Sequence, residues 1–342
     1  MVLMFASGFA GLVYQVLWMK QLGLLFGNTA HATSMTFAAF FAGLGAGSWL
    51  LGKRTTRIRN PLRLYAGLEL GIALTALIYF AILKIFHGIY PSVHAAAAGS
   101  SGMLAIKFGL SLLLISPPAF FMGGTVPVIG QVLIRRPDRF GKVAAFIYGI
   151  NTLGAAAGVA SAAFLLVPTL GFRATYVVAV LISLGVAAIS WWMSRGAAAT
   201  SAATDDQPAG SVTAPTGWRD KVAIGGLCFF SGFAVLALEV VWTRIFAQVH
   251  ENSVYSFAII LTVVLICLAL GAGISSVIAR LRKPALPTLG VLMALGGLML
   301  TLGPSMVMGV SDDLQPVHSM EAWGEYVAGL FKMGFGGIGL VV

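Results

Sequence analysis

Long apolar stretches dominate the chain, and short polar segments separate them. A helix needs about 20 apolar residues to cross a hydrocarbon core of about 30 Å. By that measure the sequence predicts about ten membrane-spanning helices, six before residue 194 and four after residue 221. They cover residues 3–26, 33–52, 64–86, 103–134, 143–167, 174–193, 222–246, 254–279, 286–308 and 326–342. We therefore expect an all-α, polytopic membrane protein.

The first predicted helix recurs in the second part of the chain. Residues 7–20, SGFAGLVYQVLWMK, return as residues 231–244, SGFAVLALEVVWTR, with half of the positions identical. Residues 44–47, LGAG, return as residues 270–273. A repeat this long and this apolar predicts two parallel halves, a construction common among secondary transporters.

The repeat also divides the chain. Residues 1–193 form a six-helix half, residues 194–221 a linker, and residues 222–342 a second half of four helices. The linker is rich in Ala, Ser, Thr, Gly and Pro, a composition typical of flexible segments. Because residues 107–109 match residues 332–334, we expect the second half to be incomplete and the chain to be a fragment or one product of a split gene.

Charge is sparse and unevenly placed. The chain is 58% hydrophobic and 9% charged, with a net charge of +10. Most Lys and Arg residues fall in segments 53–63, 135–142, 195–221 and 280–283, which alternate with loops that are nearly free of basic residues. By the positive-inside rule this predicts a cytoplasmic N-terminus and a cytoplasmic linker, with the lipid bilayer as partner and no nucleic acid.

The layout of six spans, a cytoplasmic linker and a second, similar set resembles the major facilitator superfamily. Four segments are similar to spermidine-synthase-like bacterial membrane proteins, the fused major-facilitator/spermidine synthase family: residues 7–18, 44–47, 64–71 and 122–127. The resemblance implies a bacterial inner membrane location and an aminopropyltransferase-like domain that usually follows the membrane part. The glycine pairs of this chain lie within apolar spans, so we expect no aminopropyl transfer by this chain itself.

Glu239 is the sharpest candidate for a functional side chain, and Gln15 holds the same place in the first half. A charged carboxylate near the membrane interior costs at least about 2.5–3.5 kcal/mol unless it is paired, protonated or facing water. Trp242 lies three residues after Glu239, and Trp18 three residues after Gln15, so each pair is expected to share a helix face. A carboxylate beside an aromatic ring suits an organic cation, or a proton-coupling site.

The alternative for Glu239 is an ion pair with Lys20 or Arg244 across the halves. Lys20 and Arg244 lie closer to the outer interface, where long basic side chains usually extend toward water. They therefore serve either in coupling and gating or simply as interfacial anchors.

Residues 116–127 of the fourth predicted span contain Pro117, Pro118 and Pro127. Proline removes a backbone donor, so we expect this helix to be broken, either as part of a transporter site or as a plain packing kink. Asn151 in the fifth span is either interhelical glue or a ligand contact. The His and Cys residues show no metal-binding spacing, and we expect neither metal nor cofactor.

The sequence thus predicts a transporter-like module for a small, cationic metabolite such as a polyamine. Its central site would be lined by Gln15, Trp18, Glu239 and Trp242, and the two halves would rock to give alternating access. The alternative is a non-transporting anchor for an aminopropyltransferase-like domain on the same chain or a partner chain.

Overall fold

The computed structural model describes residues 1–26, 30–55, 58, 60–97, 101–133, 140–201, 217–249, 254–278, 285–310 and 329, and its described elements are helices. They are α1 (Val2–Phe26), α2 (Ala30–Thr55), α3 (Pro61–Ala97), α4 (Ser101–Leu133), α5 (Phe140–Ser161), the π-helical turn η2 (Ala162–Leu166), α6 (Val167–Ser201), α7 (Trp218–Val249), α8 (Val254–Ile278) and α9 (Ala285–Val310). The all-α prediction is confirmed for this part of the chain.

Seven helical segments of the described residues are long and apolar enough to cross a membrane. The longest, Val143–Arg195, contains Gly171, whose φ of 77° separates two helices. A left-handed φ is strained for residues with a side chain but open to glycine, so the reversal expected near residues 168–173 occurs at this residue. α9 carries a shorter apolar stretch, Pro287–Leu298. Together these segments identify a multi-pass membrane protein.

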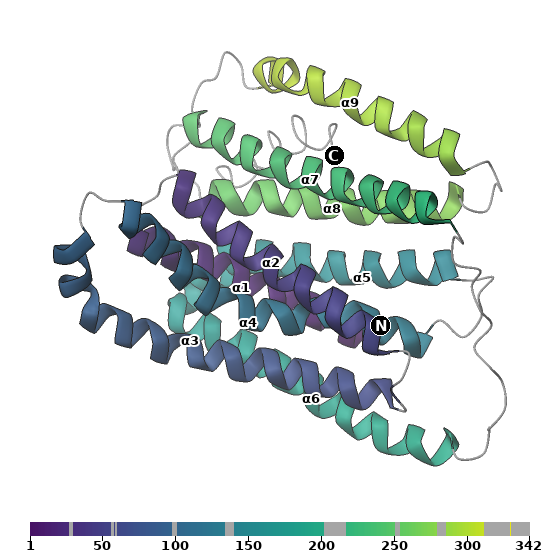
Figure 1. Ribbon diagram of the computed structural model, residues 1–342, viewed down its shortest axis with the longest axis horizontal. Helices are drawn as coiled ribbons and strands as arrows, with labels where there is room; N and C mark the ends of the chain where they lie inside the picture. Colours follow the sequence, from purple (N-terminus) through teal and green to yellow (C-terminus); the bar gives the residue numbers. More distant parts are fainter. Residues whose placement is uncertain are drawn as a thin grey trace.

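The helices pack side by side (Figure 1), with α9 at one edge of the molecule and α3 and α6 toward the opposite one. Within the first half, α1 packs against α5 and α6, α2 against α4, and α3 against α4 and α6. α5 also packs against α8, which joins the two parts of the chain. These contacts place α1 at the centre, where many of its side chains are buried.

Small residues allow the closest of these contacts. A Cβ added at Gly47 of α2 would overlap the carbonyl oxygen of Phe120 in α4, and one added at Gly8 of α1 would overlap the carbonyl oxygen of Asn151 in α5. Glycine is required at both positions because two helix backbones meet there, as in other membrane helix pairs.

The expected break in the fourth span is wrong. α4 continues from Ser101 to Leu133 with Pro117, Pro118 and Pro127 inside it. Hydroxyl groups bond carbonyls in and beside this region: Thr125 Oγ1 donates to the carbonyl of Met122 at 2.7 Å, and Ser116 Oγ to that of Ala39 in α2 at 2.9 Å. Neighbouring helices and hydroxyl side chains commonly stabilise proline in membrane helices in this way.

Some helices extend beyond the predicted spans. α3 continues to Ala97 and α6 to Ser201, while α7 begins at Trp218, so part of the predicted linker is helical. The centre of the linker, residues 202–216, and the predicted tenth span apart from residue 329 lie outside the described residues.

Candidate functional site

A cavity of about 1190 Å³ lies between helices of the two predicted halves. Its walls come from α1, α2, α4 and α5 of the first half and from α7 and α8 of the second. Most of the lining is apolar, with a few polar side chains, as is usual for sites that bind small molecules. The polar lining side chains are those of Ser7, Gln15, Ser48, Thr125, Gln131, Tyr148, Asn151, Thr152, Ser231 and Glu239.

Gln15 and Glu239, the equivalent residues of the repeat, both line this cavity. Their exposed fractions are 3% and 4%, so both side chains lie deep in the protein. The repeat accounts for the meeting, because α1 and α7 carry the same sequence motif and each turns this position toward the other half. Among the described lining residues, Glu239 carries the one carboxyl group.

In the described part of the chain, the Glu239 side chain forms no ion pair with a basic group. Its Oε1 atom has no hydrogen-bond partner among the described residues. Within the same part of the chain, Glu239 forms no ion pair with Lys20 or Arg244, and neither basic residue lines the cavity. The structure therefore does not contain the structural ion pair that the sequence left open for Glu239.

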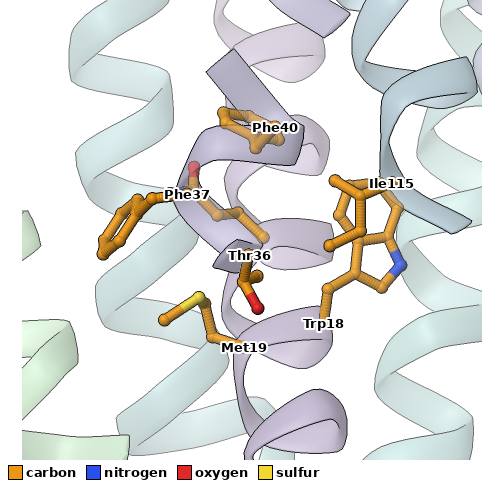
Figure 2. Close-up of a pocket in the computed structure, with 7 residues that line it drawn as sticks. Trp18, Met19, Thr36, Phe37, Phe40 and Ile115 are labelled. Atoms are coloured by element: carbon orange, nitrogen blue, oxygen red, sulfur yellow. The ribbon is translucent and has the colours of Figure 1, made fainter. Parts of the chain in front are cut away.

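Trp18 lies outside the lining of the large cavity. Its ring stacks on Tyr14 with the centroids 5.5 Å apart, and its Nε1–H donates to the hydroxyl of Tyr176 in α6 at 3.3 Å. Figure 2 shows Trp18 beside Ile115 at a packing gap that is too small for a water molecule, with Thr36 nearby. Gln15 lines both this gap and the large cavity.

Trp242 likewise lies outside the cavity lining. It is 1% exposed and packs with Ile259, Ile260, Val263 and Val264 of α8. The structure therefore brings Gln15 and Glu239 to one cavity and directs the two tryptophans into packed helix contacts.

The remaining candidates divide between the cavity and its surroundings. Asn151 and Pro127 line the cavity, while Pro117 and Pro118 lie elsewhere in α4. The backbone carbonyl of Asn151 also meets Gly8 at the contact between α1 and α5. Asn151 thus lies both at the helix contact and in the cavity wall. Its role as interhelical glue or as a ligand contact stays a prediction.

Sequence reasoning missed the serines at the start of the repeated motif. Ser7 and Ser231 both line the cavity, and Ser7 Oγ donates a hydrogen bond to Oε1 of Glu69 in α3. The signal was present, since these serines occupy one of the identical positions of the repeat. In the described part of the chain, the hydroxyl groups of Ser7 and Tyr65 lie beside the Glu69 carboxyl group.

Among the described residues, no group of His, Cys, Asp and Glu side chains is placed to hold a metal ion. The chain matches no protein-family model and no curated protein.

Proposed function

We propose that the protein is a transporter-like membrane module that moves a small, cationic metabolite by alternating access between its two halves. The observation that carries this proposal is the cavity of about 1190 Å³, which contains one carboxyl group, that of Glu239, among its described lining residues. A cavity of this size accommodates a small metabolite. A carboxylate that has no ion-pair partner among the described residues supplies the negative charge that a cationic ligand needs.

The remaining lining fits an organic amine better than a bare metal ion. Gln15 and Asn151 offer amide oxygens that accept hydrogen bonds from ammonium groups. Tyr148 adds an aromatic ring, which attracts organic cations, while the apolar lining suits the methylene segments of a polyamine. We therefore assign substrate contact to Gln15 and Glu239, and keep the contact with Trp18 and Trp242 as a prediction from the sequence.

The sequence resemblances also concern the class, location and orientation of the proposed transporter. We infer a two-half bundle of the major-facilitator type in a bacterial inner membrane with a cytoplasmic N-terminus, related to the spermidine-synthase-like membrane proteins. Support comes from the repeated motif, the contact of α5 with α8 and the alternation of basic segments with loops that are poor in Lys and Arg. A polyamine is the substrate class that both this resemblance and the Glu239 carboxylate favour.

Uptake of labelled spermidine and putrescine into proteoliposomes tests the proposal. We expect uptake by the wild type that responds to an imposed proton gradient and is lost in Glu239→Gln, because the amide keeps the shape and removes the charge. Ser276→Ala is the control, since this α8 hydroxyl is outside the cavity and donates to the carbonyl of Gly273 in its own helix at 2.7 Å.

Absence of flux in folded wild-type protein would contradict the transport proposal. It would favour the anchor function, in which the membrane part positions an aminopropyltransferase-like domain. Uptake that is equal in wild type and Glu239→Gln would keep transport and exclude Glu239 as its cation site.

A further inference from the structure

Glu69 is a second carboxyl group inside the bundle, separate from the lining of the cavity. It is 1% exposed and lies in α3, within the apolar segment Pro61–Phe86. Ser7 Oγ of α1 donates to its Oε1 atom. The side chain of Tyr65, one helical turn earlier in α3, lies against the same carboxyl group and donates to the carbonyl of Leu3 at 3.4 Å.

The described surroundings of Glu69 contain no basic partner. Its Oε2 atom is buried and has no hydrogen-bond partner in the described part of the chain. Among the described basic residues of α2 and α3, Arg63 lies 4.5 Å from the ring centroid of Trp191 and Lys53 lies 3.8 Å from that of Trp49. Lys84, later in α3, is exposed. An ionised carboxylate in this position therefore lacks a compensating positive charge, and binding a proton supplies it.

The described basic residues of the other helices that pack on α3 do not supply a compensating positive charge to Glu69 either. In α4, Lys107 is engaged elsewhere, since it donates to the carbonyl of Phe26 at the far end of α1 at 3.2 Å. In α6, Arg195 is exposed. From α1, the polar groups that face Glu69 are the hydroxyls of Ser7 and, farther away, Tyr14.

Ser7 connects this buried group with the cavity. The same side chain that donates to Glu69 also lines the cavity that contains Glu239. Among the described membrane spans, Glu69 and Glu239 are the two acidic residues. Glu239 lines the cavity, whereas Glu69 is linked to the cavity through the hydroxyl group of Ser7.

We propose that Glu69 is a proton-binding site that exchanges protons with the cavity through the hydroxyl of Ser7. The transfer is balanced: Ser7 passes its hydroxyl hydrogen to Oε1 of Glu69 while its oxygen receives a proton from hydronium in the cavity, leaving water. The reverse steps return the proton. This inference builds on the proposed transport function, since the exchanged proton would be the coupling ion for a cation held at Glu239.

Infrared difference spectroscopy on the purified, reconstituted chain tests the proton site without any substrate. Titration from acidic to alkaline pH follows the carbonyl stretch of protonated carboxyl groups. We expect a titrating band that Glu69→Gln removes and that Glu239→Gln leaves in place. Thr75→Val is the matched control in α3, because this hydroxyl donates to the carbonyl of Gly71 in its own helix at 2.6 Å. The same band in Glu69→Gln as in wild type would overturn the proposal.

Two variants of Ser7 test proton transfer through its hydroxyl group. They also test the proton site at Glu69 if Glu69→Gln does not fold. Ser7→Ala removes the hydroxyl, and we expect it to slow the response of the band to a pH jump by at least about tenfold. Ser7→Thr keeps a hydroxyl and should respond at nearly the wild-type rate. Equal rates in Ser7→Ala and wild type would overturn the relay.

Spermidine uptake separates this proposal from the transport proposal. We expect Glu69→Gln vesicles to exchange labelled for unlabelled spermidine but to lose the response to a proton gradient. A full gradient response in Glu69→Gln would overturn the coupling role while transport stands. A titrating Glu69 band in a wild-type protein that moves no spermidine would support the proton site and contradict the transport proposal.

Discussion

At the scale of single residues, the aromatic side chains around Trp18 hold three helices together. Trp18 Nε1 donates to the hydroxyl of Tyr176, which in turn donates to the carbonyl of Ala76 in α3 at 2.8 Å. Tyr79 of α3 stacks on Tyr176 with the ring centroids 5.9 Å apart. This arrangement links α1, α3 and α6 through two consecutive hydrogen bonds and explains why Trp18 is buried away from the cavity.

Tyr176→Phe should therefore destabilise the protein. It removes both bonds and leaves the indole N–H of Trp18 and the carbonyl of Ala76 without this partner, which costs about 1–3 kcal/mol for a buried polar group. Thermal unfolding of the purified protein in detergent measures the effect. Tyr148→Phe makes the same chemical change at a side chain that is 42% exposed, and should have little effect. An unchanged midpoint for Tyr176→Phe would contradict the structural role of this chain of bonds.

The sequence could predict that Gln15 and Glu239 lie at one site, but it could not predict where the two tryptophans lie. Side chains three residues apart on a helix differ by about 60° in direction, since each turn contains 3.6 residues. This difference is enough for Glu239 to line the cavity while Trp242 packs on α8. Which of the two faces the cavity depends on how the neighbouring helices pack, and the spacing alone does not contain that information.

At the scale of the helices, the repeated LGAG element provides a matched pair of positions. Gly47 of α2 is buried against α4, where an added Cβ would overlap the carbonyl oxygen of Phe120. Its counterpart, Gly273 of α8, is exposed, and an added Cβ would meet no described atom within 4 Å. The same sequence element thus has different surroundings in the two halves.

Gly47→Ala should destabilise the protein by about 1–3 kcal/mol, the usual cost of forcing extra volume into a packed contact. Gly273→Ala should leave the stability nearly unchanged, because the added methyl group meets open space. Unfolding midpoints of the two purified variants measure the difference. Equal losses in both variants would contradict the close α2–α4 contact.

For the described residues the sequence predicted where the apolar helices lie, because span length depends directly on apolar composition. It did not predict that α4 would continue through Pro117, Pro118 and Pro127. Proline removes local hydrogen bonds, but whether a membrane helix breaks depends on what the neighbouring helices offer in exchange. Here α2 packs closely along α4 and accepts the bond from Ser116.

At the scale of the whole molecule, the distribution of basic residues predicts its orientation. In a background where Cys228 and Cys267 are replaced by Ala, Ser100→Cys should react with a membrane-impermeant maleimide in intact cells. Ser211→Cys in the linker should react only after the membrane is opened, because basic segments remain on the cytoplasmic side. Labelling of the linker in intact cells would contradict the proposed topology and indicate the opposite orientation.

The repeat also predicted that residues of two distant segments would share one site. The repeat could not predict the cavity between these segments. The volume of the cavity depends on helix contacts such as that of α5 with α8, and the sequence of neither segment alone indicates that contact. The cavity and the hydroxyl link from Ser7 to Glu69 emerge only when the helices are assembled.

Equilibrium binding of labelled spermidine to the purified protein tests the cation site at Glu239 by itself, because it needs neither a gradient nor flux. We predict saturable binding by the wild type that Glu239→Gln weakens at least about tenfold, a loss of about 1.4 kcal/mol. Ser276→Ala should bind as the wild type does. Equal affinity in wild type and Glu239→Gln would contradict a cation site at the carboxyl group of the cavity.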